Sequence, residues 1–94
     1  MIRKIQHAAV VVADLEAAVD FYRILGFEEL ERPAVLQPIP GAWLSAGGSQ
    51  LHLMVDPDMG EAPGLPHVAF EVAEIDAAVA ELRARGVEVS DPTE

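Results

Sequence analysis

Three histidines are the residues of this 94-residue chain whose type and spacing predict chemistry. His7 and His67 each open an alternating segment rich in valine and alanine, and His52 lies in a third such segment, "SQLHLMV". Because strand side chains alternate between two faces, each His lies on the face opposite its apolar neighbours. A single strand His is more often a hydrogen-bonded or exposed residue than a ligand. Three histidine side chains that converge on one point would form a site for a transition metal, since imidazole is the commonest ligand of these ions.

Four further residues are candidates for the walls of a small-molecule pocket. Gln50 and Met54 share the face of His52 by the same alternation. Trp43 lies seven residues before Gln50 in the sequence. It is either a wall of the pocket or an ordinary core residue. Glu71 lies four residues after His67, on the same face of the expected strand, and is either a carboxylate ligand or, as we favour, a solvated edge charge. No catalytic residue is predicted.

An internal repeat explains why two of the histidines occur in the same context. Shifting the sequence by 60 residues aligns "IQHAAVVVADLEAAVDFYRILGFEEL" with "LPHVAFEVAEIDAAVAELRARGVEVS", with ten identities in 26 positions. The aligned pairs include His7 with His67 and Gly26 with Gly86. Composition alone rarely aligns His, Arg and Gly in one register, so we infer a duplicated unit whose copies need each other to bury a core. The two histidines would then be related by a pseudo-twofold axis.

The elements that must position these residues follow from periodicity and from turn residues. Apolar spacing predicts helices that end at capping glycines, and Asp14 is a plausible N-cap. Gly47-Gly48 predicts a tight hairpin turn. The order is β-α-β-β-β and then β-α-β. Strands are expected at 5–12, 27–31, 42–46, 49–55, 67–72 and 87–89, helices at 15–25 and 75–85, and a loop at 32–41.

Composition sets limits on location and partners. Sixteen acidic residues against six basic ones give a net charge of −10, which repels phosphate backbones and argues against a nucleic-acid partner. No apolar run reaches the length of a membrane span. The chain has no cysteine, so thiolate chemistry and disulfides are excluded. A cytoplasmic location is the default expectation.

The segments "HAAVVVADLEAAVDFYRILGFEE", "LHLM" and "HVAFEVAEIDAAVAELRARGVEV" together resemble the glyoxalase / bleomycin resistance / extradiol dioxygenase superfamily, the vicinal oxygen chelate proteins. The resemblance covers almost the whole chain. It implies an α+β fold of paired βαβββ modules that form a curved mixed sheet, a glyoxalase-like cup around a divalent metal. We expect one such domain over residues 1–94, with module one at 5–56, a linker at 57–66 and a partial module two at 67–94.

The resemblance also implies ligands and an activity. His7 and His67 match metal ligands, and His52 matches a position that carries a glutamate ligand in glyoxalase I types, so it either binds the metal or faces the substrate. The remaining family ligand would fall near position 112, so we expect a truncated second module or a partner chain that completes the site. The resemblance implies one divalent metal (Zn, Ni, Mn or Fe), a homodimer and lyase, isomerase or dioxygenase chemistry on a small molecule. The alternative is a metal-free protein that binds an antibiotic or other small molecule.

Overall fold

The computed structural model describes residues 1–58 and 68–92. The chain divides into two compact units, residues 1–61 and 62–94, and each unit is described by itself. The expected module and linker boundaries stay a prediction. The elements of the first unit are β1 (His7–Val12), α1 (Leu15–Ile24), β2 (Glu28–Leu30), the short 3₁₀ helix η1 (Ala34–Leu36), β3 (Gly41–Ala46) and β4 (Ser49–Val55).

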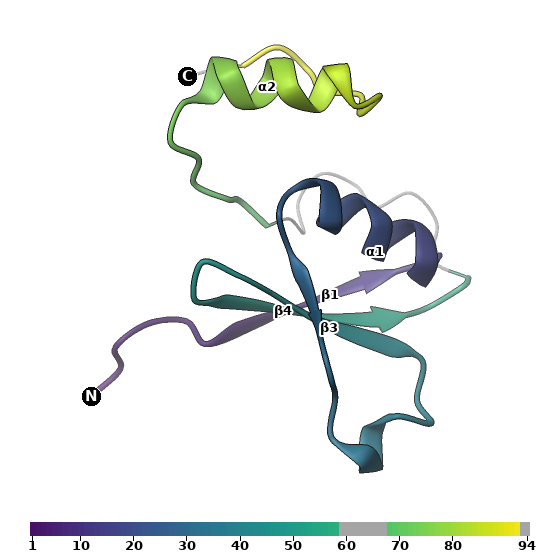
Figure 1. The fold of residues 1–94 in the computed structure, drawn as a ribbon. Coiled ribbons are helices and arrows are strands. Elements are labelled where there is room, and N and C mark those ends of the chain that lie inside the picture. The colour runs from purple at the N-terminus through teal and green to yellow at the C-terminus, as the bar shows by residue number, and fades with distance from the viewer. Residues whose placement is uncertain (59–67, 93–94) are drawn as a thin grey trace. The chain divides into compact units, whose positions relative to one another are not determined.

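The first unit is a four-stranded mixed sheet in the order β1-β4-β3-β2, with α1 on one face (Figure 1). The β1 strand runs parallel to β4, and the other two pairings are antiparallel. This is the predicted βαβββ order, so the α+β, glyoxalase-like fold class is confirmed. The predicted loop over 32–41 was too simple, because it contains η1 and its last residue already belongs to β3.

Helix α1 forms where the sequence provides a cap and an apolar face. The Asp14 carboxylate accepts a hydrogen bond from the Ala17 backbone N–H at 3.1 Å, which satisfies one of the free donors at the helix start. Val19 is buried against the sheet. Four neighbours pack against the same core, as their spacing predicted: Leu15, Ala18, Tyr22 and Leu25.

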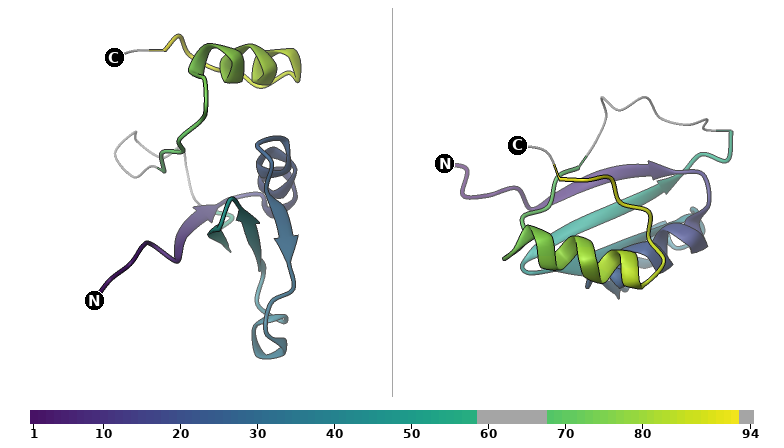
Figure 2. Two further views of the ribbon diagram at one scale, coloured as in Figure 1. Left: turned by 60° about the vertical axis from the view of Figure 1, so that its left-hand side comes forward. Right: turned by 90° about the horizontal axis from the view of Figure 1, so that it is seen from above.

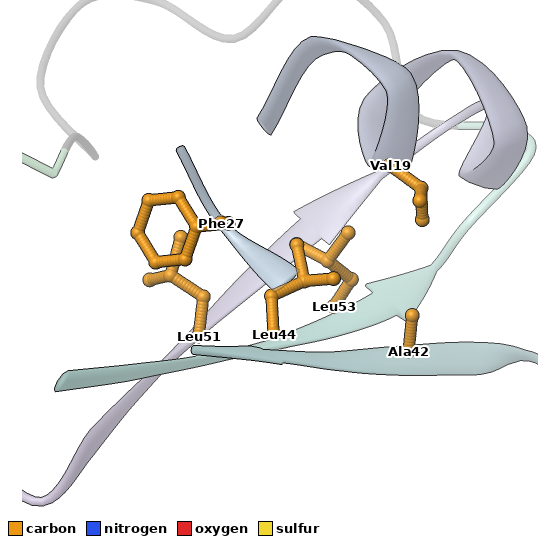
Figure 3. Close-up of a cluster of buried hydrophobic side chains, with 6 residues drawn as sticks. All are labelled: Val19, Phe27, Ala42, Leu44, Leu51 and Leu53. Carbon is orange, nitrogen blue, oxygen red and sulfur yellow. The ribbon is translucent and has the colours of Figure 1, made fainter. Parts of the chain in front are cut away.

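The core of the first unit lies between α1 and one face of the sheet. Alternate residues of β3 and β4 point toward the helix (Figure 3). Leu44 at the centre is fully buried. The six buried side chains of this cluster are Val19, Phe27, Ala42, Leu44, Leu51 and Leu53.

The second unit contributes helix α2 (Ile75–Ala84), one residue shorter than predicted. The strands expected at 67–72 and 87–89 are not formed at described residues 68–72 and 87–89. A strand exists only through its hydrogen-bonded partner, and the described part of this unit offers none. Val68, Phe70 and Val72 were expected to share a buried face, but they are 39–45% exposed. No helix in the described ranges is long and apolar enough to cross a membrane.

The two helices repeat each other in their terminal hydrogen bonds as well as in their sequences. The Glu74 carboxylate accepts from the Ala77 backbone N–H at 2.7 Å, the bond that Asp14 makes to Ala17. Both helices end in the same Schellman pattern, with a glycine of positive φ. The equivalent bonds run from Gly26 N–H to Arg23 O and from Phe27 N–H to Tyr22 O, and from Gly86 N–H to Arg83 O and from Val87 N–H to Leu82 O. Local geometry thus supports the inferred duplication.

Candidate functional site

The face of the sheet away from α1 carries the candidate residues of the first unit, and we call it the distal face. Strand alternation places Ala42, Leu44, Leu51 and Leu53 on the helix side, so their neighbours lie on the other. Cα register then aligns the residues across the strands. The distal face consists of His7, Ala9 and Val11 on β1, Gln50, His52 and Met54 on β4, Gly41, Trp43 and Ser45 on β3, and Glu28 and Leu30 on β2.

Three rings stack on the distal face. The His7 and His52 ring centroids are 4.0 Å apart with planes inclined by 11°. Trp43 stacks on the other side of His52, at 4.1 Å and 6°. The sheet dictates this arrangement, since β4 lies between β1 and β3 and His52 pairs directly with Trp43. His52 is therefore held between an exposed imidazole and a half-buried indole.

Hydrogen bonds to two glutamine side-chain oxygens define which ring nitrogens remain available. The Gln50 side-chain oxygen accepts from His52 Nε2 at 3.0 Å. The Gln6 side-chain oxygen bonds His7 Nδ1 in the same way. Because an amide oxygen only accepts, each of these ring nitrogens carries the proton in this hydrogen-bond network. His52 Nδ1 and His7 Nε2 are left as the basic nitrogens of the neutral rings.

The environment of His52 lowers the pKa of its imidazole below the usual value near 6.5. Burial is the larger cause, since it disfavours the charged ring, and the charge of the neighbouring His7 adds to it. The neutral, ligand-competent form of His52 is therefore favoured at neutral pH.

Replacing His7 by alanine should raise the pKa of His52. The change removes both a ring that covers His52 and a neighbouring positive charge. NMR titration of the ring proton of His52 in the presence of a chelator measures this directly. Val11→Ala, a change on the same face outside the stack, is the control and should leave the pKa unchanged. A His52 pKa at or above 6.5 in the wild type, or one that His7→Ala does not raise, would contradict this account.

The geometry of the stack limits how the two histidines can act on a metal. A metal bound by imidazole nitrogen lies in the plane of that ring. The two planes are nearly parallel with centroids 4.0 Å apart, so one ion cannot lie in both. One ring must turn before both can bind the same ion. Among the residues that the structure describes, no group of three potential ligands is assembled.

The other predicted site residues fall into two groups. Trp43, Gln50 and Met54 lie on the distal face with His7 and His52. Alternation predicted this face for Gln50 and Met54, whereas Trp43 was left open between a pocket wall and the core. Glu71 is an exposed residue of the second unit, and His67 lies outside the described residues. The ring stack and the position of Arg32 beside Gly41 were not predicted. The two-residue turn at Gly47-Gly48 already implied that Trp43 pairs with His52.

Comparison with known proteins establishes the family. The model described as "Glyoxalase/Bleomycin resistance protein/Dioxygenase superfamily" matches residues 4–94. The uncharacterized protein YwkD of Bacillus subtilis (strain 168) is 33% identical over 99 residues, which cover 94% of this chain and 76% of YwkD. The βαβββ sheet and its strand histidines thus define a glyoxalase-like domain. The chain belongs to the Glyoxalase/Bleomycin resistance protein/Dioxygenase superfamily.

Solved structures agree with this assignment. The crystal structure of a Bacillus anthracis protein assigned to the glyoxalase family is 32% identical, with a TM-score of 0.80 over 94% of this chain and 74% of that one. The fosfomycin resistance protein FosX of Listeria monocytogenes, solved as its E126Q mutant with Mn(II) and 1S,2S-dihydroxypropylphosphonic acid, has a TM-score of 0.72 at 23% identity. The match covers 97% of this chain and 75% of FosX, and at this identity it shows the shared fold alone.

Proposed function

We propose that this protein is a metal-dependent enzyme that acts on a small molecule with vicinal oxygens. In this proposal His7 and His67 hold one divalent metal, with His52 as a further ligand or as a group that faces the substrate. The observation that carries the proposal is the contact between His7 and His52 on neighbouring strands, with ring centroids 4.0 Å apart. Family membership gives this pair of imidazoles its context.

The donor set fits a divalent transition metal in type. His7 Nε2 and His52 Nδ1 are the unprotonated nitrogens, and imidazole suits Zn, Ni, Mn and Fe alike. His7 is exposed on the edge strand β1, so it is the ring that can turn out of the stack. In this proposal His67, the repeat mate of His7, is the ligand that is supplied from outside the first unit.

The described residues support a defined division of roles around such a site. A bound divalent metal supplies a Lewis acid that stabilises negative charge developing on substrate oxygens, as lyase, isomerase or dioxygenase chemistry requires. Gln50 holds the proton on His52 Nε2, which keeps Nδ1 free. Trp43 covers the other face of His52, so it fixes the ring and excludes water from that side.

Metal analysis of protein purified without chelator tests the proposal. We expect about one equivalent of Zn, Ni, Mn or Fe per protein chain, and a large loss of that metal in His67→Ala. Glu71→Gln is the matched control in the second unit, because we assign Glu71 to solvent, and it should keep its metal. Metal-free wild-type protein that also fails to bind added zinc would refute a metal enzyme.

The second candidate function is a metal-free small-molecule binding protein of the same fold. The closed stack of Trp43, His52 and His7 favours it, because the rings contact one another face to face and do not converge their nitrogens on one point. The same metal analysis separates the two functions. The homodimer implied by the family resemblance stays a prediction.

A further inference from the structure

Arg32 lies at the end of the distal face opposite His7. Leu30 pairs with Trp43, so the antiparallel register continues to Arg32 opposite Gly41. A Cβ placed on Gly41 would lie 3.2 Å from Arg32 Nη1, so the guanidinium occupies the space where a side chain of residue 41 would be. The segment between β2 and β3 extends beyond the sheet on the side away from α1 (Figures 1 and 2). Arg32 is therefore a residue of the distal face.

Backbone carbonyls hold this guanidinium in place. Arg32 Nη2 donates to Ile39 O at 2.8 Å and to Gln37 O at 3.4 Å. The Gln37 side-chain nitrogen donates back to Arg32 O at 3.1 Å. Within residues 1–58 and 68–92 these bonds use only one of the two terminal nitrogens, so Nη1 over Gly41 keeps its donors there. The side chain is preorganised before any ligand arrives.

The charge of Arg32 is not neutralised within the described part of the chain. Three other arginines have a carboxylate oxygen within 3.6 Å of the guanidinium: Arg23, Arg83 and Arg85. Among residues 1–58 and 68–92, Arg32 has no carboxylate within ion-pair distance. It is also the one half-buried base, since the other five are exposed. In a protein of net charge −10, a guanidinium that is fixed by backbone carbonyls and has no carboxylate partner among the described residues is a candidate anion site.

The surroundings of Arg32 define the kind of ligand that fits. Met54 pairs with Gly41 and Val11 pairs with Met54, and these two apolar side chains are 55% and 43% exposed on the distal face. Guanidinium groups bind carboxylates and other oxyanions strongly. Neighbouring strands lie about 4.8 Å apart, and a strand rises about 3.4 Å per residue. The Cα atoms of Gly41 and His52 are therefore roughly 8 Å apart across the sheet.

We propose that Arg32 is an anion-binding residue that selects organic acids with an apolar chain. The carboxylate accepts hydrogen bonds from Nη1, and the chain lies over Met54 and Val11. As the specificity determinant of an enzyme, this assignment rests on the proposed function: the substrate carries a negative group in addition to its vicinal oxygens. Anion binding itself requires only the first unit.

Fluorescence of Trp43, the single tryptophan, tests the proposal in metal-free protein with chelator present. The probes are hexanoate and hexanamide, which match in length and differ in charge. Wild type should bind hexanoate about tenfold more tightly, as expected for a charged hydrogen bond. Arg32→Gln should abolish this preference. Arg32→Lys should retain part of it, and a preference in this variant supports the proposal even if Arg32→Gln does not fold.

The matched control is Arg23→Gln, an arginine already paired with Glu29 and Asp20, which should keep the preference for hexanoate. Equal affinities for the two probes in the wild type, no binding of hexanoate, or a preference that survives Arg32→Gln would overturn the proposal. A preference lost equally in Arg23→Gln would also overturn it, because it would reflect overall charge. Since no metal is present, failure here is independent of failure of the metal site.

Discussion

Replacing Leu44 by alanine should lower the free energy of unfolding of the first unit by about 2–5 kcal/mol. Leu44 is fully buried at the centre of the sheet, beneath α1 and beside Leu51 (Figure 3). The core cluster has only six buried members, so few neighbours can move to fill the cavity. Small domains are stable by roughly 5–15 kcal/mol in total, and this change therefore removes a large share of the stability.

Urea unfolding followed by Trp43 fluorescence measures this loss, because the single tryptophan lies in the first unit. Val35→Ala is the matched control: Val35 is 80% exposed in η1, so its truncation should change stability by less than about 0.5 kcal/mol. A loss below about 1 kcal/mol in Leu44→Ala would mean that the core is not packed as described. An unchanged m-value would show that the variant changes stability and not the surface exposed on unfolding.

The first unit could be predicted from the sequence because each local signal agreed with the others. Asp14 and Gly26 marked the ends of α1, and apolar spacing marked its buried face. Gly47 and Gly48 both adopt positive φ, as the two central residues of a tight hairpin turn of this type must. That turn sets the register of the β3–β4 hairpin, and register sets which residues share a face.

The second unit was predicted correctly only where its structure is local. Helix α2 needs no partner for its backbone hydrogen bonds, and Glu74 and Gly86 mark its ends as their repeat mates do. The expected strand at 68–72 has the same alternating pattern as β1, but a pattern does not supply the neighbouring strand that pairing requires. Val68 and Phe70 are accordingly exposed.

The distal face was predicted in part for a similar reason. Alternation placed His7 and His52 on one side of the sheet, whereas their stacking depends on β1 lying next to β4. That pairing joins strands distant in sequence, and no local signal encodes it. Arg32 was missed because its segment reads as a proline-rich loop, and its position over Gly41 follows only from the register of β2 with β3.

Replacing His7 by alanine should weaken zinc binding at least about 100-fold, since it removes one of the few ligands that the site offers. The stack also predicts how binding proceeds. Because the planes of His7 and His52 are inclined by only 11°, coordination of one zinc ion by both rings requires His7 to turn out of the stack and expose His52. Competition titration with a chromogenic chelator measures the affinity, and the shift of the His52 ring protons reports the opening of the stack.

Two further variants make this prediction decisive. Trp43→Phe keeps both imidazoles while changing the ring that covers His52, so zinc affinity should stay within a few-fold of the wild type. His52→Ala decides the role left open for that residue: a loss equal to that of His7→Ala makes it a ligand, and unchanged affinity assigns it to the substrate. If His7→Ala binds zinc as tightly as wild type, the metal site is not on the distal face. If Trp43→Phe loses as much as His7→Ala, the effect is packing rather than coordination.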